Sequence, residues 1–301
     1  MNFKALIGGL AVPAVIFSMA SCSCGSDNGQ LNNNITEEKA DSELVVSGEV
    51  VSDMIQNISS PVEMANEIKN SGVGFSKDIL NEAGKEGQYE TNFKKAVNLG
   101  VYAADLGYIN TFSKTTVVVD YLTSIKRLAD GLGVGQFLDF STLSALAKNS
   151  TNLDSLKQLS VNSFNNIDKY LREQHRSNIS TAIVVGTWIE GIYITGQVIS
   201  QTNDKGLVDR LGEQKNIVEI LDIVVSSRTE SEFKNLGKMM GDLKSIYDGV
   251  RITTELGQPE TKEVDGMLVI EQNEITHVEI TPEQVNSIIE QVNAIRNSII
   301  R

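Results

Sequence analysis

The sequence predicts a mainly α-helical protein, built as a multi-helix bundle or as stacked helical hairpins, with a small β-hairpin and a final helix at the C-terminal end. Composition is the first observation behind this prediction, because the 301 residues include only 4 prolines and few aromatic residues. Such a chain, rich in Leu, Ile, Val, Ala, Lys and Glu, favours helix. Periodicity is the second observation: apolar residues recur at helical spacing along most of the chain and alternate at strand spacing only near residues 267–280.

The first predicted helices lie between residues 44 and 72. The valine-rich stretch over 44–58 places apolar residues near helical spacing, so we expect a helix there. Ser60-Pro61-Val62-Glu63 then has the pattern of a capping box with proline at the first helical position, and Gly72 is expected to end that helix. The same signals predict further helices over 90–113, 115–132, 141–148, 152–175, 180–201, 205–226 and 230–250.

The C-terminal part of the chain has a different pattern. In GMLVIEQNEITHVEI, β-branched residues stand on both sides of Gln272-Asn273-Glu274, which predicts a β-hairpin over about 267–280. An isolated hairpin is marginal in water, so we expect it to lie against the helices. Thr281-Pro282-Glu283-Gln284 then opens a terminal helix over 282–300 with a regular apolar stripe.

Two stretches hint at an internal duplication. LGVYAADLGYI resembles VGTWIEGIYI when Gly100 is aligned with Gly186 and Tyr102 with Trp188. Two related helical hairpins stacked side by side would produce this similarity. Two core helices of like composition would produce it as well, so the sequence leaves both interpretations open.

The N-terminal residues have the layout of a secretory signal peptide. Lys4 is the only charge, an apolar run covers residues 5–20, and small residues follow. The apolar run is shorter than the roughly 20 residues that a membrane-spanning helix needs. We therefore expect residues 1–21 to be a cleaved signal peptide, residues 22–42 a polar, flexible tether, and residues 43–301 the helical domain.

Met19-Ala20-Ser21-Cys22 resembles the lipobox of bacterial lipoprotein precursors, although leucine is more usual at the position of Met19. The resemblance covers about residues 1–24. It implies that Cys22 carries thioether-linked diacylglycerol, that cleavage occurs before it, and that a fatty acid such as palmitate is attached to its amino group. Aspartate directly after the lipidated cysteine is the inner-membrane retention signal in some bacteria. Ser23 at that position therefore implies placement in the outer membrane, on its periplasmic or its outer side.

Two alternatives remain for the two cysteines of the chain. Lipidation at Cys24 would leave Cys22 where a small residue is preferred. A plain secretion signal would leave both thiols free or paired, but cysteines two residues apart strain the geometry of a disulfide. Since the chain has no other cysteine, it has no disulfide framework.

The charge balance excludes some partners. Loss of residues 1–21 would remove one lysine and no acidic residue, so the net charge would fall from −13 to −14. An acidic chain is not expected to bind nucleic acid or to adhere electrostatically to anionic lipid. Membrane attachment is therefore expected to come from the acyl chains alone.

Buried carboxylates are the candidate site for chemistry. Asp105 and Glu190 interrupt otherwise apolar helices, and two facing carboxylates would form an acid/base pair or hold a cation. The alternative is that each meets Lys or Arg, or points to water. Tyr102 and Trp188 complete the set of candidate pocket or buried polar residues.

Glycines such as Gly100 and Gly186 in the same helices indicate either close helix packing or room for a ligand. The apolar run over 179–200 contains Glu190, and a mid-helix carboxylate would cost about 3 kcal/mol in a membrane. We therefore expect that run to be a buried core helix.

Most catalytic motifs are missing from the sequence. The chain has only 2 histidines, too few for a histidine-rich metal site. It has neither a Gly-x-Ser-x-Gly motif nor a phosphate-binding Gly-x-x-x-x-Gly-Lys-Ser/Thr loop. We therefore expect no metal and no cofactor.

Three functions remain open from the sequence. The favoured one is a membrane-anchored lipoprotein of the cell envelope with a helical, non-catalytic domain that binds a protein partner. The second is a carrier or sensor with a small-molecule or lipid pocket between the glycine-bearing helices. The third, a remote alternative, is a hydrolase that uses Asp105, Glu190 or His175.

Overall fold

The computed structural model describes residues 67–147, 153–257, 260–264, 267–271 and 274–301. By its internal contacts the chain divides into two units, Met1–Glu43 and Leu44–Arg301, and the description below concerns the second. The predicted signal peptide, lipobox, tether, helix over 44–58 and capping box at Ser60 lie outside the described residues.

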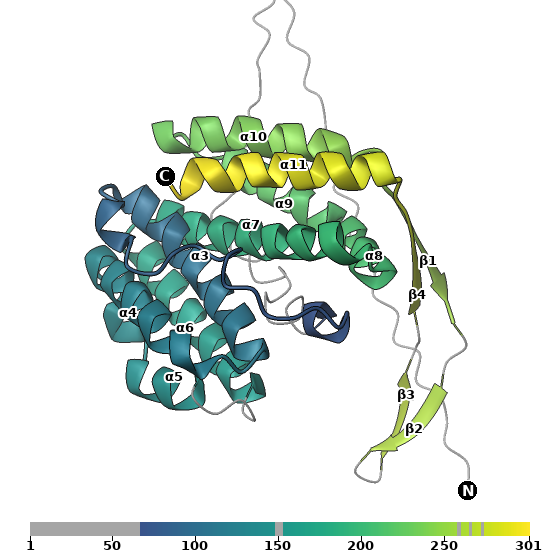
Figure 1. Ribbon diagram of the computed structural model, residues 1–301, viewed down its shortest axis with the longest axis horizontal. Helices are drawn as coiled ribbons and strands as arrows, with labels where there is room; N and C mark the ends of the chain where they lie inside the picture. The colour runs from purple at the N-terminus through teal and green to yellow at the C-terminus, as the bar shows by residue number, and fades with distance from the viewer. Residues whose placement is uncertain (1–66, 148–152, 258–259, 265–266, 272–273) are drawn as a thin grey trace, which may run out of the picture. The chain divides into compact units, whose positions relative to one another are not determined.

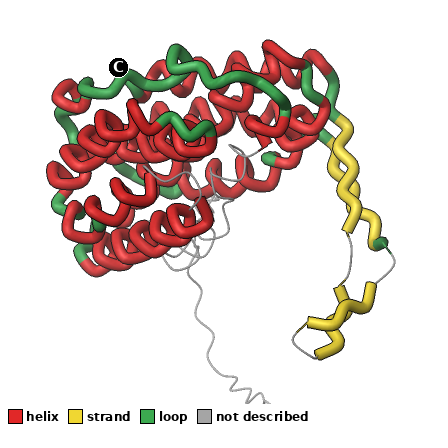
Figure 2. The backbone as a smooth tube through the Cα atoms, turned by 60° about the horizontal axis from the view of Figure 1, so that its bottom comes forward, coloured by secondary structure: helices red, strands yellow, loops and turns green. Residues whose placement is uncertain are grey.

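The fold is mainly α-helical, as predicted (Figures 1 and 2). Residues 67–70 end a first helix before Gly72, whose φ of 80° stops it in the left-handed region. The remaining described helices are α3 (Asn92–Thr111), α4 (Thr115–Leu132), α5 (Phe140–Ala147), α6 (Leu153–Glu173), α7 (Ser177–Thr202), α8 (Lys205–Glu213), α9 (Lys215–Ser226), α10 (Ser231–Tyr247) and α11 (Pro282–Ile299), with short 3-10 turns η1 (Glu86–Gln88) and η2 (Gly135–Phe137).

The prediction of one helix over residues 205–226 is wrong. The chain forms α8 and α9, which meet at Gln214. The side chain of Gln214 is buried, where it accepts a hydrogen bond from Trp188 Nε1 at 3.0 Å and donates one to the carbonyl of Arg210 at 3.3 Å. A buried amide bound on both sides holds the chain at this break, and apolar spacing alone carries no sign of it.

The strand pairing also differs from the prediction. The two strands beside Gln272-Asn273 do not pair with each other: β4 (Glu274–Glu279) is antiparallel to β1 (Arg251–Leu256), and β3 (Met267–Glu271) is antiparallel to β2 (Glu260–Val264). The two-stranded sheet of β1 and β4 is called the ribbon below. Val278 pairs with Ile252, and both pack against the helical core. This end of the ribbon lies against the helices, as expected.

The core is centred on α3 and α7, which pack closely against each other (Figure 1). A Cβ atom at Gly100 would overlap the carbonyl oxygen of Ile183, and one at Gly186 would overlap that of Val97. Close helix packing therefore explains both glycines, and no space for a ligand exists beside either. By length and composition α7 is apolar enough to cross a membrane, but most of its apolar window is buried inside the fold, as expected of a core helix.

The contacts of these glycines are reciprocal. Gly100 meets Ile183 and Gly186 meets Val97, so the same offset of 86 residues relates both the two glycines and their two partners. Such reciprocity is what two helices related by a local twofold axis would show. The helices that follow differ, since α4 has 18 residues and α8 has 9, so the relation is evident only where α3 and α7 cross.

Candidate functional site

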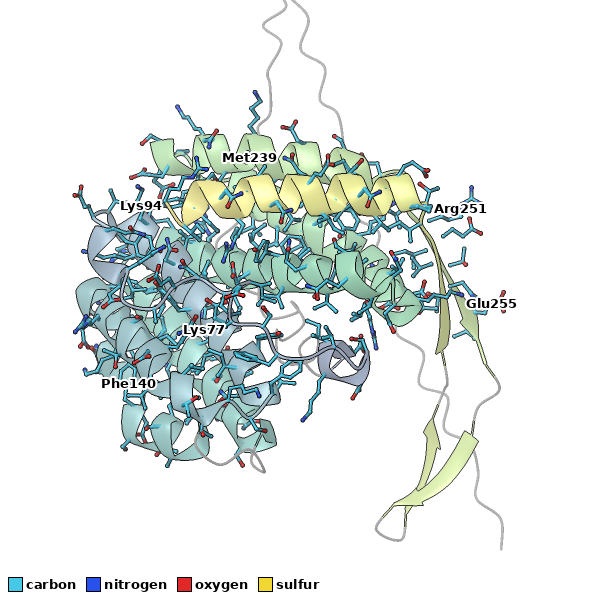
Figure 3. The ribbon with its side chains drawn as sticks, viewed as in Figure 1. Lys77, Lys94, Phe140, Met239, Arg251 and Glu255 are labelled. Atoms are coloured by element: carbon cyan, nitrogen blue, oxygen red, sulfur yellow. The ribbon has the colours of Figure 1, made fainter. Side chains whose placement is uncertain are left out.

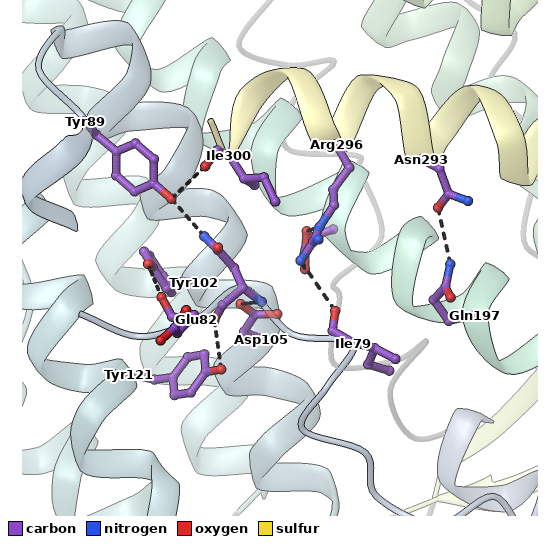
Figure 4. A network of polar contacts seen from close by, with 12 residues as sticks. Ile79, Glu82, Tyr89, Tyr102, Asp105, Tyr121, Gln197, Asn293, Arg296 and Ile300 are labelled. Carbon is purple, nitrogen blue, oxygen red and sulfur yellow. Dashed lines mark hydrogen bonds and ion pairs between the residues drawn. The ribbon is translucent and has the colours of Figure 1, made fainter. Parts of the chain in front are cut away.

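A buried charged cluster connects three helices of the core (Figure 4). Asp105 of α3 and Glu190 of α7 are 0% exposed, and Arg296 of α11 is 7% exposed. Arg296 donates from Nε to Glu190 Oε2 and from Nη2 to Glu190 Oε1, both at 2.9 Å. This two-pronged geometry is the strongest arrangement that an arginine and a carboxylate form.

The helix packing places each member of the cluster. Asp105 and Glu190 face inward because both faces of α3 and α7 are covered by other helices. Arg296 lies four residues after Val292, on the buried stripe of α11. Its guanidinium also stacks over the ring of Tyr193, 4.1 Å from the ring centre.

The environment shifts the pKa values of all three groups. Burial raises the pKa of Asp105 well above its usual value, and the negative charge of Glu190 raises it further. Burial also raises the pKa of Glu190, although the hydrogen bonds and charge of Arg296 oppose that shift. Burial disfavours the charge of Arg296, but the hydrogen bonds to Glu190 and the nearby negative charges together outweigh burial, so its pKa is raised.

The cluster also holds a stretch of irregular backbone between residues 76 and 84. The backbone N–H of Asn81 donates to Asp105 Oδ2 at 3.2 Å. Arg296 Nη2 donates to the carbonyl of Ile79 at 3.4 Å. Groups on α3 and α11 therefore satisfy backbone polar atoms that no helix or sheet satisfies here.

Buried tyrosines bind the same backbone stretch (Figure 4). Tyr102 donates to the carbonyl of Glu82 and Tyr121 to that of Asn81, each at 2.8 Å. Tyr89 accepts from Asn81 Nδ2 at 3.1 Å and donates to the carbonyl of Ile300 at 3.4 Å. The polar atoms of the site are therefore used to fix an irregular segment onto the core.

The structure brings together two of the four residues that the sequence predicts for this site. Asp105 and Glu190 lie in one cluster, and Tyr102 borders it through its bond to Glu82. Trp188 is separate, since its indole binds Gln214. Sequence reasoning missed Arg296, although its place on the i, i+4 spacing of Ile288 and Val292 was a signal of burial.

A hollow of about 450 Å³ lies elsewhere, at the surface between residues 67–70 and α8. Arg210 in its wall is already bound, to Glu67 and Glu213 at 2.8 Å each. The other charged side chains lining it, such as Asp204, are acidic. It is therefore unrelated to the buried cluster and offers no unpaired cation to an anionic ligand.

The cluster is closed to substrates as the structure stands. Both carboxyl groups are fully buried, so a reacting molecule could not reach them without separation of α3, α7 and α11. Among the described residues, no group of three or more His, Cys, Asp or Glu side chains is arranged to hold a metal ion. What the arrangement can do is hold charge and share a proton between two carboxyl groups.

Comparison with known proteins gives no further guide to this site. No protein-family model matches the chain, and no curated protein or solved structure matches it.

Proposed function

We propose that the protein is a lipid-anchored component of the bacterial cell envelope whose helical domain binds a protein partner through the ribbon. Under this proposal, acyl chains on Cys22 hold the protein at the outer membrane, and residues 22–42 tether the domain to it. The helices provide a rigid body and the ribbon provides the contact surface. The exposure of the ribbon is the observation that carries the proposal.

The ribbon leaves most of its side chains uncovered. In β1 only Ile252 is partly buried, and Leu256 is 73% exposed, the highest value among the large hydrophobic residues that the structure describes. Arg251 and Glu255 project from the same strand (Figure 3). A two-stranded sheet is marginal in water unless something packs against it. A partner that covered β1 would bury Leu256 and supply this packing.

The base of the ribbon is firmly attached to the helices. A Cβ at Gly212 of α8 would overlap the side chain of Val278, so strand and helix are in direct contact. Lys215 donates to the carbonyl of Val250 at 2.8 Å, just before β1 begins. Force or binding at the ribbon would therefore be transmitted to α8 and α9.

The closed cluster favours binding over catalysis. Asp105, Glu190 and His175 were the residues on which a hydrolase would depend. Asp105 and Glu190 bind protein groups in a fully buried site, and His175 is exposed in the turn between α6 and α7. The carrier alternative needed space beside Gly100 and Gly186, and each glycine is instead in contact with the backbone of the other helix.

Site-specific photo-crosslinking tests the ribbon. A photoreactive residue in place of Leu256 is expected to give one adduct of defined mass in the native membranes. The matched control replaces Val119 of α4, which is 49% exposed and lies outside the ribbon. Native mass spectrometry should then show the adduct's partner at fixed stoichiometry. Equal crosslinking at both positions, or none at Leu256, would refute the role of the ribbon.

A further inference from the structure

One atom of the buried cluster has no hydrogen-bond partner. Asp105 Oδ2 accepts from the backbone of Asn81, but no donor reaches Asp105 Oδ1 among the described residues. Buried oxygen atoms without a partner are rare and costly. The nearby Glu190 is itself an acceptor when it is ionised, so two ionised carboxyl groups cannot satisfy each other.

A single proton resolves this conflict. We infer that Asp105 is a neutral carboxylic acid whose Oδ1–H donates to Glu190, so that Asp105, Glu190 and Arg296 form a one-proton latch. The latch joins the backbone at residues 79–81 to α3, α7 and α11. This inference concerns the interior of the domain and does not depend on the proposed function.

The charge balance around Asp105 supports this assignment. On α7 it faces Glu190 and Tyr193, and on α11 it faces the cation Arg296, which is hydrogen-bonded to Glu190 and not to Asp105. The tyrosines Tyr102 of α3 and Tyr121 of α4 are neutral neighbours, since burial raises both of their pKa values above the usual range. One guanidinium balances one carboxylate, and Arg296 is already bound by both prongs to Glu190.

The assignment of the proton to Asp105 follows from the same geometry. Glu190 accepts two hydrogen bonds from Arg296, and such bonds favour the ionised form of a carboxyl group. Among the described residues Asp105 accepts a hydrogen bond only from the backbone amide of Asn81. The carboxyl group with fewer donors and no direct cation is the one that keeps the proton.

Loss of this proton would open the latch. An ionised Asp105 would place a second negative charge in a buried site beside Glu190, where the described residues supply no cation besides Arg296 to compensate it. The two carboxylates would repel each other, and the bonds that fix Asn81 and Ile79 depend on both. High pH is therefore expected to loosen the contact between the irregular segment and α11 before it affects the rest of the helices.

The sign of the pH dependence follows from linkage. The pKa of Asp105 is raised in the folded protein, so the fold binds this proton more tightly than the unfolded chain does. Its stabilising contribution is complete below the ordinary pKa of aspartate, about 3.9. This contribution falls as pH rises from the unfolded pKa to the raised pKa of the folded state. Between these two pKa values the unfolding constant grows about tenfold per pH unit.

Urea unfolding of the full chain between pH 5 and pH 8 tests the latch. Unfolding is monitored by the fluorescence of the single tryptophan, Trp188. The variant Asp105→Asn keeps the shape and supplies an N–H donor to Glu190 without a titrating proton. The ratio of the wild-type to the variant unfolding constant is expected to rise about tenfold per pH unit until Asp105 ionises in the fold. Equal slopes for the two proteins would overturn the inference.

Two further measurements test whether Asp105 carries the proton, and the second of them does not need the Asp105→Asn variant to fold. Glu190→Gln should destabilise the fold more than Asp105→Asn at pH 7, because it strands Arg296 without its carboxylate; the reverse order would assign the proton to Glu190 and overturn the inference. If Asp105→Asn does not fold, infrared spectra of the wild-type protein with isotope-labelled aspartate must show the C=O band of a protonated carboxylic acid at pH 7. Absence of that band would also overturn it.

Discussion

At the scale of single residues, the close packing of the two core helices depends on two glycines, which have no side chain. Gly100 and Gly186 allow the backbones of α3 and α7 to touch, and a backbone carbonyl oxygen of the opposite helix sits where each Cβ would otherwise stand. Glycine within a helix costs roughly 1 kcal/mol relative to alanine. That cost is offset here by close packing, which then positions Asp105 next to Glu190.

Substitution of alanine for glycine should therefore lower stability at the helix contact and not at an open position of another helix. Gly186→Ala would force α7 away from the carbonyl of Val97 and is expected to lower the free energy of unfolding by about 2 kcal/mol. The matched control is Gly241→Ala in α10, where the nearest atom is Asp222 Oδ1 at 3.7 Å. That variant should be neutral or stabilised by up to about 1 kcal/mol.

Urea unfolding curves of the two variants measure this difference directly. If Gly186→Ala were as stable as Gly241→Ala, the contact between α3 and α7 would be looser than described. Space for a ligand beside Gly186 would then have to be considered again.

At the scale of elements, α11 is held both by its cap and by its buried arginine. Thr281 accepts from the backbone of Gln284 at 3.2 Å, and the Gln284 side chain accepts from the backbone of Thr281 at 2.8 Å. This capping box fixes the start of α11 directly after the ribbon. The orientation of α11 in turn determines whether Arg296 reaches Glu190.

Removal of this cap should cost about 1 kcal/mol. Thr281→Ala deletes the hydroxyl that binds the helix N-terminus, so the free energy of unfolding should fall by that amount. Thr281→Ser keeps the hydroxyl and should retain most of the stability. Thermal or urea unfolding of the pair separates the cap from the rest of the threonine side chain, and equal losses in both variants would contradict a role for the cap.

The elements also show which parts of the fold the sequence could predict. The helix over 115–132 and the start of α11 were predicted to the residue, because glycine, proline and threonine mark helix ends by local chemistry. The break at Gln214 was missed because it depends on a hydrogen bond to Trp188, 26 residues away. β1 was missed because both of its faces are exposed, so its sequence does not alternate.

The candidate site was predictable only in part, because local sequence pattern reveals single unusual residues and not their long-range partners. Asp105 and Glu190 are conspicuous as charges inside apolar helices, and local pattern was enough to single them out. Arg296 is followed by two exposed polar residues, Asn297 and Ser298, and its distance of four residues from Val292 is what hints at burial. That it pairs with Glu190, 106 residues away, is a property of the packed helices and not of any local stretch.

At the scale of the whole molecule, the distribution of apolar residues separates a membrane anchor from a membrane span. The apolar residues of α7 are used up by the core, where most of them are buried. The chain carries a net charge of −13, which disfavours adhesion to anionic lipid. Under the proposed function the protein is held at the membrane by acyl chains on a cysteine, and two or more chains give stable attachment.

The final prediction tests the proposed lipid anchor: it concerns Cys22 and uses Cys24 as its matched control. Cys22→Ala should release the protein from the membrane fraction or leave it as an uncleaved precursor, because the acylated sulfur would be absent. Cys24→Ala should change neither its fractionation nor its processing. Intact-mass measurement of the membrane-extracted wild-type protein should give a chain that begins at residue 22 and carries the added mass of its acyl groups. Loss of the anchor in Cys24→Ala with retention in Cys22→Ala would move the attachment point to Cys24. Retention of both variants as processed chains without added acyl mass would refute lipid anchoring altogether.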